Sequence, residues 1–197
     1  MLGERDIAPD PFTQFSRWFN DAASVPDANA MTLATATRTG KVSARVVLLK
    51  GFDERGFSFF TNYESRKGRE LTENPHAALV FYWQPLGRQV RIEGIVTRMS
   101  EEESDAYFRT RPVGSQLGAL ASPQSQPIPN REFLETRYNE VAERFTHDPV
   151  PRPKHWGGYR LAPHAVEFWQ SRENRLHDRI LYTKTESDRW QVVRLAP

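Results

Sequence analysis

The sequence contains no cysteine among its 197 residues. This excludes disulfides, thiolate catalysis and cysteine-bound metals. The five histidines show no ligand spacing such as His-x-x-x-His, so we expect no metal site. The longest apolar stretch, residues 77–83, is far too short to span a bilayer, and the first residues carry no apolar signal core. We therefore expect a cytoplasmic protein with no membrane segment.

The chain also lacks an excess of either charge, since 27 Lys and Arg residues nearly balance 25 Asp and Glu residues. A general nucleic-acid binder shows a clear basic excess, so nucleic acid is not an expected partner. No Gly-x-Gly-x-x-Gly fingerprint is present, which argues against a Rossmann domain. The length fits one domain over residues 1–197, with residues 1–9 as a short flexible N-terminal arm.

Short strands joined by tight turns dominate the pattern. We expect strands over residues 31–37, 42–52, 57–61, 76–83, 89–99, 158–161, 165–169, 179–183 and 190–194. So many strands favour an antiparallel sheet that closes into a barrel. The expected fold class is therefore mostly β with peripheral helices.

Capping residues predict where helices begin. Asp10 before Pro11 predicts one start, and Ser65 predicts a second helix that ends before Pro75. Ser100 with Glu103 has the form of a capping box. Further helices are expected around residues 115–121 and 131–145.

Two groups of cations suit phosphate binding. Arg45 and Lys50 lie on the expected strand 42–52, although two strand cations reaching water is an open alternative. Arg66 and Lys67 follow Ser65 at a helix start, where free N–H groups and a hydroxyl favour a phosphate dianion. A solvated first turn capped by Ser65 is an equally open interpretation.

A third group, Tyr107, Arg111 and Ser115, is spaced four residues apart. Pro112 interrupts the helix and places the three at a helix junction, where a phenol, a guanidinium and a hydroxyl suit a second phosphate. The alternative is a buried tyrosine beside a surface arginine.

Near the end of the chain, Arg175, His177 and Arg179 occupy alternate positions. Alternate residues of an extended segment point the same way. The pattern predicts three groups that face one space, opposite something anionic or electron-rich.

This last run resembles the end of the pyridoxamine/pyridoxine 5'-phosphate oxidases, the FMN enzymes that make pyridoxal 5'-phosphate. The resemblance covers residues 8–197 in order. It runs through RVVLLK at 45–50, TN at 61–62, SRKG at 65–68, RQV at 88–90, YF at 107–108, RP at 111–112, GSQ at 114–116, QS at 124–125, WGG at 156–158, EFWQ at 167–170 and RLAP at 194–197. It implies a split β-barrel that binds FMN at the interface of a homodimer.

The resemblance also implies roles for individual residues. The substrate phosphate would contact Lys50, Tyr107, Arg111 and Ser115, while Arg175 and His177 would lie over the substrate ring as the catalytic pair. FMN would contact Arg45, Val46, Val47, Leu48, Leu49, Lys50, Phe60, Thr61, Ser65, Arg66, Lys67, Gln89, Gln124, Ser125, Trp169 and Arg179. Phe60 stands where the family often has tyrosine. Ser171 stands where glycine is usual, and serine is more restricted at positive φ, so we expect it to shift the loop.

The expected activity is oxidation of pyridoxine 5'-phosphate and pyridoxamine 5'-phosphate to pyridoxal 5'-phosphate, with O2 as acceptor and H2O2 as product. One alternative is a phenazine-type FMN oxidase of the same fold, against which Lys50, Tyr107, Arg111 and Ser115 argue. Another is a non-catalytic protein that binds flavin or pyridoxal phosphate.

Overall fold

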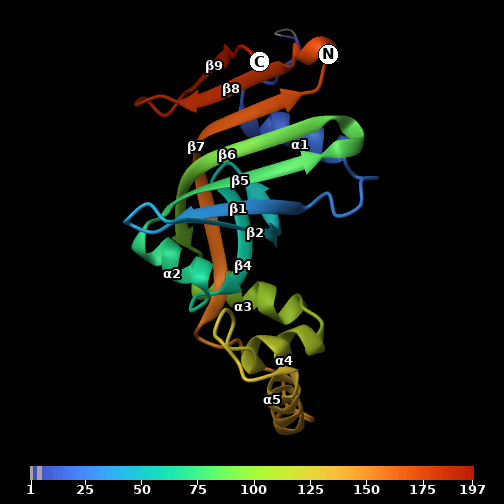
Figure 1. Cartoon of the computed structure of the whole chain (residues 1–197), viewed down its shortest axis with the longest axis vertical. Helices are drawn as coiled ribbons and strands as arrows, with labels where there is room; N and C mark the ends of the chain where they lie inside the picture. Colours follow the sequence, from blue (N-terminus) through green and yellow to red (C-terminus); the bar gives the residue numbers. More distant parts are fainter. Residues whose placement is uncertain (1, 4–5) are drawn as a thin grey trace.

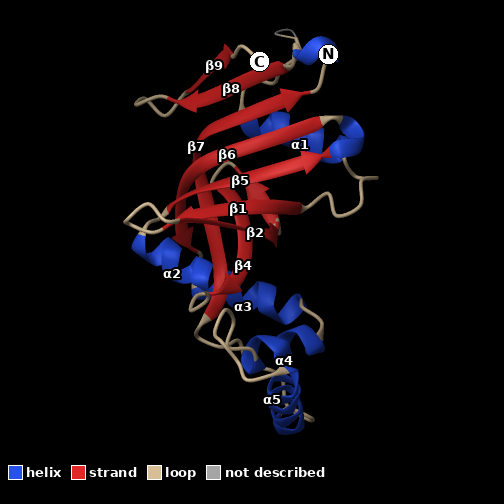
Figure 2. Cartoon of the chain, viewed as in Figure 1, coloured by secondary structure: helices blue, strands red, loops and turns tan. Residues whose placement is uncertain are grey.

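The computed structural model describes residues 2–3 and 6–197. A curled sheet forms its upper and middle parts, and three helices gather at its lower end (Figures 1 and 2). The strands are β1 (Ala30–Ala36), β2 (Val42–Leu48), β3 (Gly51–Asp53), β4 (Gly56–Asn62), β5 (His76–Trp83), β6 (Arg88–Arg98), β7 (Trp156–Gln170), β8 (Asp178–Lys184) and β9 (Trp190–Arg194). The α-helices are α1 (Pro11–Asp21), α2 (Arg66–Glu73), α3 (Glu101–Thr110), α4 (Val113–Ala121) and α5 (Arg131–Arg144). Two short 3-10 turns are η1 (Gln84–Leu86) and η2 (Glu173–Arg175). The prediction of a mostly β fold with peripheral helices is confirmed.

The long strand β7 organises the sheet. The strand order is β2-β1-β5-β6-β7-β4-β3, with β8 also paired to β7 and β9 to β8, and every pairing is antiparallel. The first part of β7 pairs with β4, up to Leu161 opposite Phe57, and the second part pairs with β8, from Ala165 onward. One edge of β7 therefore serves two different strands, and the sheet divides there.

The prediction of separate strands over 158–161 and 165–169 was wrong, because β7 runs through both. Pro163 is tolerated at a register shift in the pairing with β6, where Gly94 faces Pro163 and the preceding Glu93 faces Ala165. Such a bulge is one of the few places in a sheet that accepts a proline, which has no N–H to donate.

The single strand expected over 42–52 is likewise two strands. β2 ends at Leu48 and β3 begins at Gly51. Between them, the Leu49 N–H donates to Asn29 O at 2.8 Å and the Lys50 N–H donates to Ser58 O at 2.9 Å. The chain thus changes its partner from the β1 side to β4, and this change curls the sheet toward closure.

The predicted helix starts are confirmed by their caps. Asp10 accepts from the N–H groups of Phe12 and Thr13, Ser65 accepts from Gly68, and Ser100 forms the capping box with Glu103. Helix α1 places its apolar face on the core. Phe15, fully buried, lies edge-on to Phe52, Phe57 and Phe81 with ring centroids 4.8–5.1 Å apart.

The N-terminal arm packs onto the body of the protein where it is described. Leu2 and Ala8 are buried, and the Tyr182 hydroxyl donates to Ala8 O at 2.8 Å. Of the arm expected over 1–9, residues 1, 4 and 5 lie outside the described residues. Among the helices of the described chain, none combines the length and apolar character needed to cross a membrane.

The register shift beside Gly94 generates a stability prediction. A Cβ at Gly94 would lie 2.2 Å from the backbone oxygen of Ala162, so Gly94→Ala must displace backbone. Overpacking of this kind costs about 1–3 kcal/mol. We expect a lower melting temperature in differential scanning fluorimetry, under identical protein and ligand concentrations.

The control for this variant is Gly118→Ala in α4. A Cβ there meets nothing within 4 Å, and alanine is the better helix former by about 0.5–1 kcal/mol. Its melting temperature should stay level or rise. An equal fall in both variants would contradict the packing argument.

Candidate functional site

A polar cleft of about 530 Å³ lies where β2 and β4 meet the junction of α3 and α4. It brings together most of the residues predicted to hold two phosphates. The predicted residues that line it are Arg45, Val46, Val47, Leu48, Lys50, Phe60, Thr61, Lys67, Tyr107, Arg111, Ser115 and Gln124. Thr110, Pro112 and Trp156 also line it and were not predicted. Five stretches of the chain, residues 45–50, 60–67 and 107–115 with Gln124 and Trp156, thus form one site.

Arg45 enters the cleft from the half-buried face of β2. Its guanidinium donates to Leu33 O at 3.2 Å, to Thr35 Oγ1 at 2.6 Å and to the Ser43 hydroxyl. The same group forms an ion pair with Glu70 at 3.2 Å. These fixed partners exclude the interpretation of Arg45 as a strand cation that reaches for water.

Sequence reasoning missed Glu70, the acid beneath this cluster. Its side chain is buried and accepts from Thr35 Oγ1 at 2.5 Å, Ser43 Oγ at 2.6 Å and Arg66 Nε at 2.9 Å, besides Arg45. Burial alone would raise the pKa of Glu70, but the four hydrogen bonds outweigh it and lower the pKa to about 2. The four-residue spacing from Arg66 to Glu70 on the expected helix was the one available signal.

Lys67 reaches into the cleft from the first turn of α2. Its ammonium donates to Gln124 Oε1 at 2.9 Å and to Thr61 Oγ1 at 3.1 Å. Burial, followed by repulsion from Arg45, lowers the pKa of Lys67 to about 8. A cation held at such a cost fits an anion-binding site, because a bound anion would offset both effects.

Ser65 is placed differently from the prediction. It is fully buried, its hydroxyl donates to Asn62 O at 2.7 Å, and it accepts from the Gly68 N–H and, at 3.3 Å, from Lys67. It does not line the cleft. Its role in the structure is to cap α2 and to support Lys67.

Tyr107, Arg111 and Ser115 meet at a helix junction, as predicted. Helix α3 ends at Thr110, Arg111 caps it in an extended conformation, and Pro112 leads into α4. The Arg111 guanidinium lies 4.5 Å from the Trp156 ring centroid, and burial lowers its pKa. Its buried Nη1 has no hydrogen-bond partner among the described residues. An unpaired buried donor of this kind fits a site for an anionic ligand.

Five other predicted residues, Gln89, Trp169, Arg175, His177 and Arg179, form a second group away from this cleft. Gln89 on β6 lies opposite Trp169 on β7, and Trp169 lies opposite Arg179 on β8. The His177 ring lies 4.6 Å from the Trp169 ring, and its Nδ1 accepts from the Arg172 N–H at 3.1 Å. Figure 1 places this group at the upper end of the sheet, beside the short orange helix, and α3 and α4 at the opposite end.

The alternation argument for the run 174–180 was wrong. Asn174 and Arg175 adopt positive φ angles of 55° and 61° within η2, so the segment is not extended. Arg175 is exposed at the tip of this turn. Arg179 lies in β8, where its guanidinium forms an ion pair with Glu167 at 2.7 Å.

The structure also places the other residues that were predicted to lie at the site. Ser171 is not among the residues at positive φ, so the reason for expecting it to shift the loop does not apply. Ser125 has φ 68° and is exposed outside the cleft, next to Gln124, which lines it. Leu49 is buried in the core, and Arg66 is turned toward Glu70 with 60% of its side chain exposed.

Comparison with known proteins identifies relatives of the whole chain. The model of the family described as pyridoxamine 5'-phosphate oxidase matches residues 21–145. The model described as pyridoxine 5'-phosphate oxidase C-terminal dimerisation region matches residues 156–197. A pyridoxine/pyridoxamine 5'-phosphate oxidase of Cupriavidus necator is 59% identical, over 100% of this chain and 93% of that protein. One from Paraburkholderia phymatum is 60% identical, over 98% and 91%.

Solved structures share the fold. PhzG from Burkholderia lata, in complex with tetrahydrophenazine-1-carboxylic acid, superimposes with a TM-score of 0.93 at 37% identity, over 100% of this chain and 98% of that one. A pyridoxamine 5'-phosphate oxidase-related, FMN-binding protein from Nostoc punctiforme gives a TM-score of 0.79 at 19% identity, over 97% and 100%. The expected FMN-binding split β-barrel fold is confirmed.

The buried Glu70 predicts a pH dependence of stability. Its folded pKa of about 2 lies below the ordinary value of 4.5, so its stabilisation is complete above pH 4.5 and is lost as the pH falls through 2. The difference corresponds to roughly 3 kcal/mol. Glu70→Gln should have a lower free energy of unfolding at pH 7. Its free energy of unfolding, measured with urea at a series of pH values, should also fall less steeply as the pH is lowered.

The matched control is Glu135→Gln, which removes another four-residue helix ion pair, Arg131–Glu135 at 2.6 Å. This pair is on the surface, where such pairs contribute little. Its pH profile should follow that of the unmodified protein. If both variants show the same dependence of unfolding free energy on pH, the hydrogen bonds and ion pairs of the buried Glu70 do not cause the loss of stability in acid.

Proposed function

Since this chain belongs to the pyridoxamine 5'-phosphate oxidase family, we propose that it oxidises pyridoxine 5'-phosphate and pyridoxamine 5'-phosphate to pyridoxal 5'-phosphate. The cofactor is FMN, the electron acceptor is O2, and H2O2 is the second product. The observation that carries the proposal is that Lys50, Tyr107, Arg111 and Ser115 line the same cleft as Arg45 and Lys67. Two phosphate monoesters need two such sets of donors.

The first set of cations would hold the FMN phosphate. Arg45 and Lys67 line the cleft, and Arg66 is tied to the same buried carboxylate as Arg45. A terminal monophosphate suits this compact cluster, which favours FMN over FAD. FMN, when bound, supplies the group that accepts hydride from the substrate and then passes electrons to O2.

The second set would bind the substrate phosphate. The unpaired Nη1 of Arg111 supplies a charged donor, and the Tyr107 ring, stacked on Phe60 at 3.9 Å, fixes one wall. Phe60 therefore contributes by its ring rather than by a hydroxyl. Arg175 and His177 would orient the substrate ring, and the charge of Arg175 would favour loss of the substrate proton.

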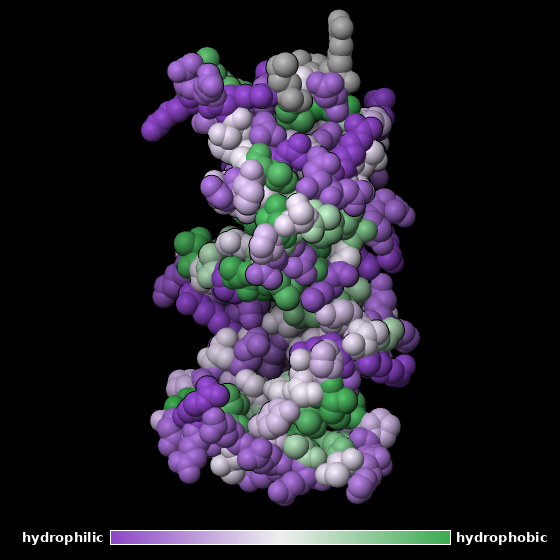
Figure 3. All heavy atoms as spheres, turned by 90° about the vertical axis from the view of Figure 1, so that its right-hand side faces the viewer, coloured by the Kyte–Doolittle hydropathy of each residue, from purple (hydrophilic) through white to green (hydrophobic). Residues whose placement is uncertain are grey.

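A homodimer would bring Arg175 and His177 to the cleft. Within one protomer the two groups lie at opposite ends of the sheet (Figure 1). In a two-fold dimer every contact between two different positions occurs twice, so an arrangement that brings the loop of one protomer to the cleft of its partner forms two such sites. The match to a C-terminal dimerisation region supports this arrangement. Hydrophobic side chains also gather on the surface at mid-height (Figure 3), and Val46 and Tyr82 are 65% and 59% exposed.

A phenazine-type oxidase is the second candidate, favoured by the TM-score of 0.93 to PhzG. The identity of 59–60% to two pyridoxine/pyridoxamine 5'-phosphate oxidases, against 37% to PhzG, supports the first. The substrate phosphate separates them, because tetrahydrophenazine-1-carboxylic acid offers none.

Arg111→Ala should distinguish the two candidates. A hydrogen bond to a charged group contributes about 1.5–3 kcal/mol. The variant should therefore lose roughly 10- to 150-fold in kcat/KM for pyridoxine 5'-phosphate, and far less for pyridoxine without phosphate. Flavin content, measured by absorbance, should not change.

The control for this variant is Arg109→Ala, an exposed arginine in the last turn of α3 that does not line the cleft. It should behave like the unmodified protein with both substrates. Equal losses of Arg111→Ala on both substrates would make Arg111 structural and would reopen the phenazine-type candidate.

Mixed dimers test the shared site. Arg111→Ala and His177→Ala chains, each with lowered activity at limiting pyridoxine 5'-phosphate, should regain activity when co-expressed, because a mixed dimer contains one site with neither change. Random pairing makes half of the dimers mixed, which restores about a quarter of the unmodified activity. Mixed dimers purified with two affinity tags provide the measurement and should show about half of the unmodified activity, because one of their two sites carries neither change. Activity no higher than the sum of the parents would mean that both residues act within one chain.

A further inference from the structure

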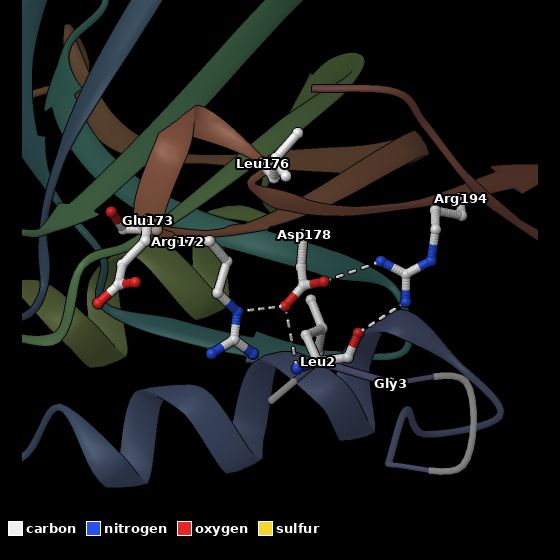
Figure 4. Close-up of a pocket in the computed structure, with 8 residues that line it drawn as sticks. Leu2, Gly3, Arg172, Glu173, Leu176, Asp178 and Arg194 are labelled. Carbon is white, nitrogen blue, oxygen red and sulfur yellow. Dashed lines mark hydrogen bonds and ion pairs between the residues drawn. The ribbon is translucent and has the colours of Figure 1, made fainter.

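We propose that Asp178 is a positioning residue that fixes the loop carrying Arg175 and His177; the inference rests on the function proposed above. Asp178 is the first residue of β8 and does not line the cleft at the other end of the sheet. Its carboxylate is nonetheless the point where three separate segments meet: the loop 171–177, the N-terminal residues and the last strand (Figure 4).

The first contact closes the loop. Arg172 Nε donates to Asp178 Oδ2 at 2.8 Å, so the residue before η2 is tied to the residue after His177. The Nη2 atom of Arg172 is buried and has no hydrogen-bond partner among the described residues. Asp178 is therefore the principal anchor of this side chain.

The second contact lies inside the closed loop. The backbone N–H of the same Arg172 donates to Nδ1 of His177 at 3.1 Å. A neutral imidazole that accepts at Nδ1 carries its proton on Nε2. With one face of the ring against Trp169, the His177 ring is fixed in both tautomer and orientation. Loss of the Arg172 anchor would release the N–H that sets this tautomer.

The loop also holds a conformation that needs outside support. Asn174 and Arg175 are two consecutive residues with positive φ, 55° and 61°. Non-glycine residues persist in this region when the surrounding structure holds them. The ion pair between Arg172 and Asp178 spans both residues and closes the turn that presents Arg175.

The third set of contacts ties Asp178 to both ends of the chain. Arg194 on β9 donates to Asp178 Oδ1 at 2.9 Å and to Leu2 O at 2.9 Å, and the Leu2 N–H approaches Asp178 Oδ2 at 3.4 Å. In Figure 4, Arg172 and Arg194 approach the carboxylate from opposite sides. Burial raises the pKa of Asp178, but its hydrogen bonds from Arg172, Leu2 and Arg194 outweigh this and lower it, so the carboxylate stays charged.

The test compares Asp178→Asn with Asp188→Asn. Both replace an aspartate of the β8–β9 hairpin that forms an ion pair, but the Asp188 pair with Lys184 lies at the far turn, with Asp188 84% exposed. The first readout is the rate at which the substrate bleaches bound flavin in stopped flow. Asp178→Asn should be roughly 10- to 100-fold slower, since small misplacements of reacting groups have effects of this size. Flavin affinity should stay within about twofold, because the phosphate cations lie elsewhere.

The second readout does not depend on activity. Nitrogen-15 NMR of the histidine rings, at a pH where they are neutral, should show the Nε2–H tautomer alone for His177 in the unmodified protein. Asp178→Asn should give a mixture of tautomers, and Asp188→Asn should not. Asp178→Glu, which keeps the charge, should recover part of the flavin reduction rate and part of the Nε2–H tautomer population of His177.

The outcomes separate the two proposals. If neither phosphorylated substrate reduces the flavin of the unmodified protein, the proposed function fails. The tautomer of His177 measured by NMR still tests the positioning role of Asp178. If Asp178→Asn keeps the single tautomer and the full reduction rate, the positioning role is overturned. If Asp178→Asn binds flavin more weakly and melts at a lower temperature as well as being reduced more slowly, Asp178 is only structural. That result also overturns the proposal.

Discussion

The buried ion cluster around Glu70 is the constraint on which the cleft depends. Three cations, Arg45, Arg66 and Lys67, gather where β2, β4 and α2 meet, and like charges in a partly buried space repel. Glu70 offsets that repulsion, since its buried carboxylate accepts from both guanidinium groups and from two hydroxyls and does not itself line the cleft. The cluster can therefore be assembled before a ligand arrives, and association does not have to order it.

The second constraint is the length of β7. An extended strand rises about 3.3 Å per residue, and β7 has 15 residues. Trp156 at its start packs on Arg111, and Trp169 near its end packs on His177. One strand thus carries a wall of the cleft near its start and the support of the loop near its end, at a separation that no side chain spans. Under the proposed function, the cleft and the loop of one protomer are therefore too far apart to act on one substrate, and a second copy would supply the missing part.

Both chain ends take part in holding the distal loop. Leu2, Arg194 and Arg172 meet at Asp178, so the loop is attached to the first and last segments of the chain as well as to the sheet. Long-range ties of this kind order a loop that has little packing of its own, since Arg175 and Leu176 at its tip are exposed.

Local chemistry determined much of this protein from the sequence alone. The caps at Asp10, Ser65 and Ser100, most of the strands, and the junction at Pro112 follow from neighbouring residues, and they emerge in the structure as predicted. The family resemblance also identified most of the residues that line the cleft; Thr110, Pro112 and Trp156 are the exceptions.

Tertiary structure decided the rest. Only the pairing with β6 allows β7 to run through Pro163, and only the fold brings Glu70 under Arg45. The run from 174 to 180 reads as extended, but two left-handed residues turn it, held by Arg172, Asp178 and the chain ends. Sequence spacing reports local periodicity; it does not report which distant groups will stabilise a departure from it.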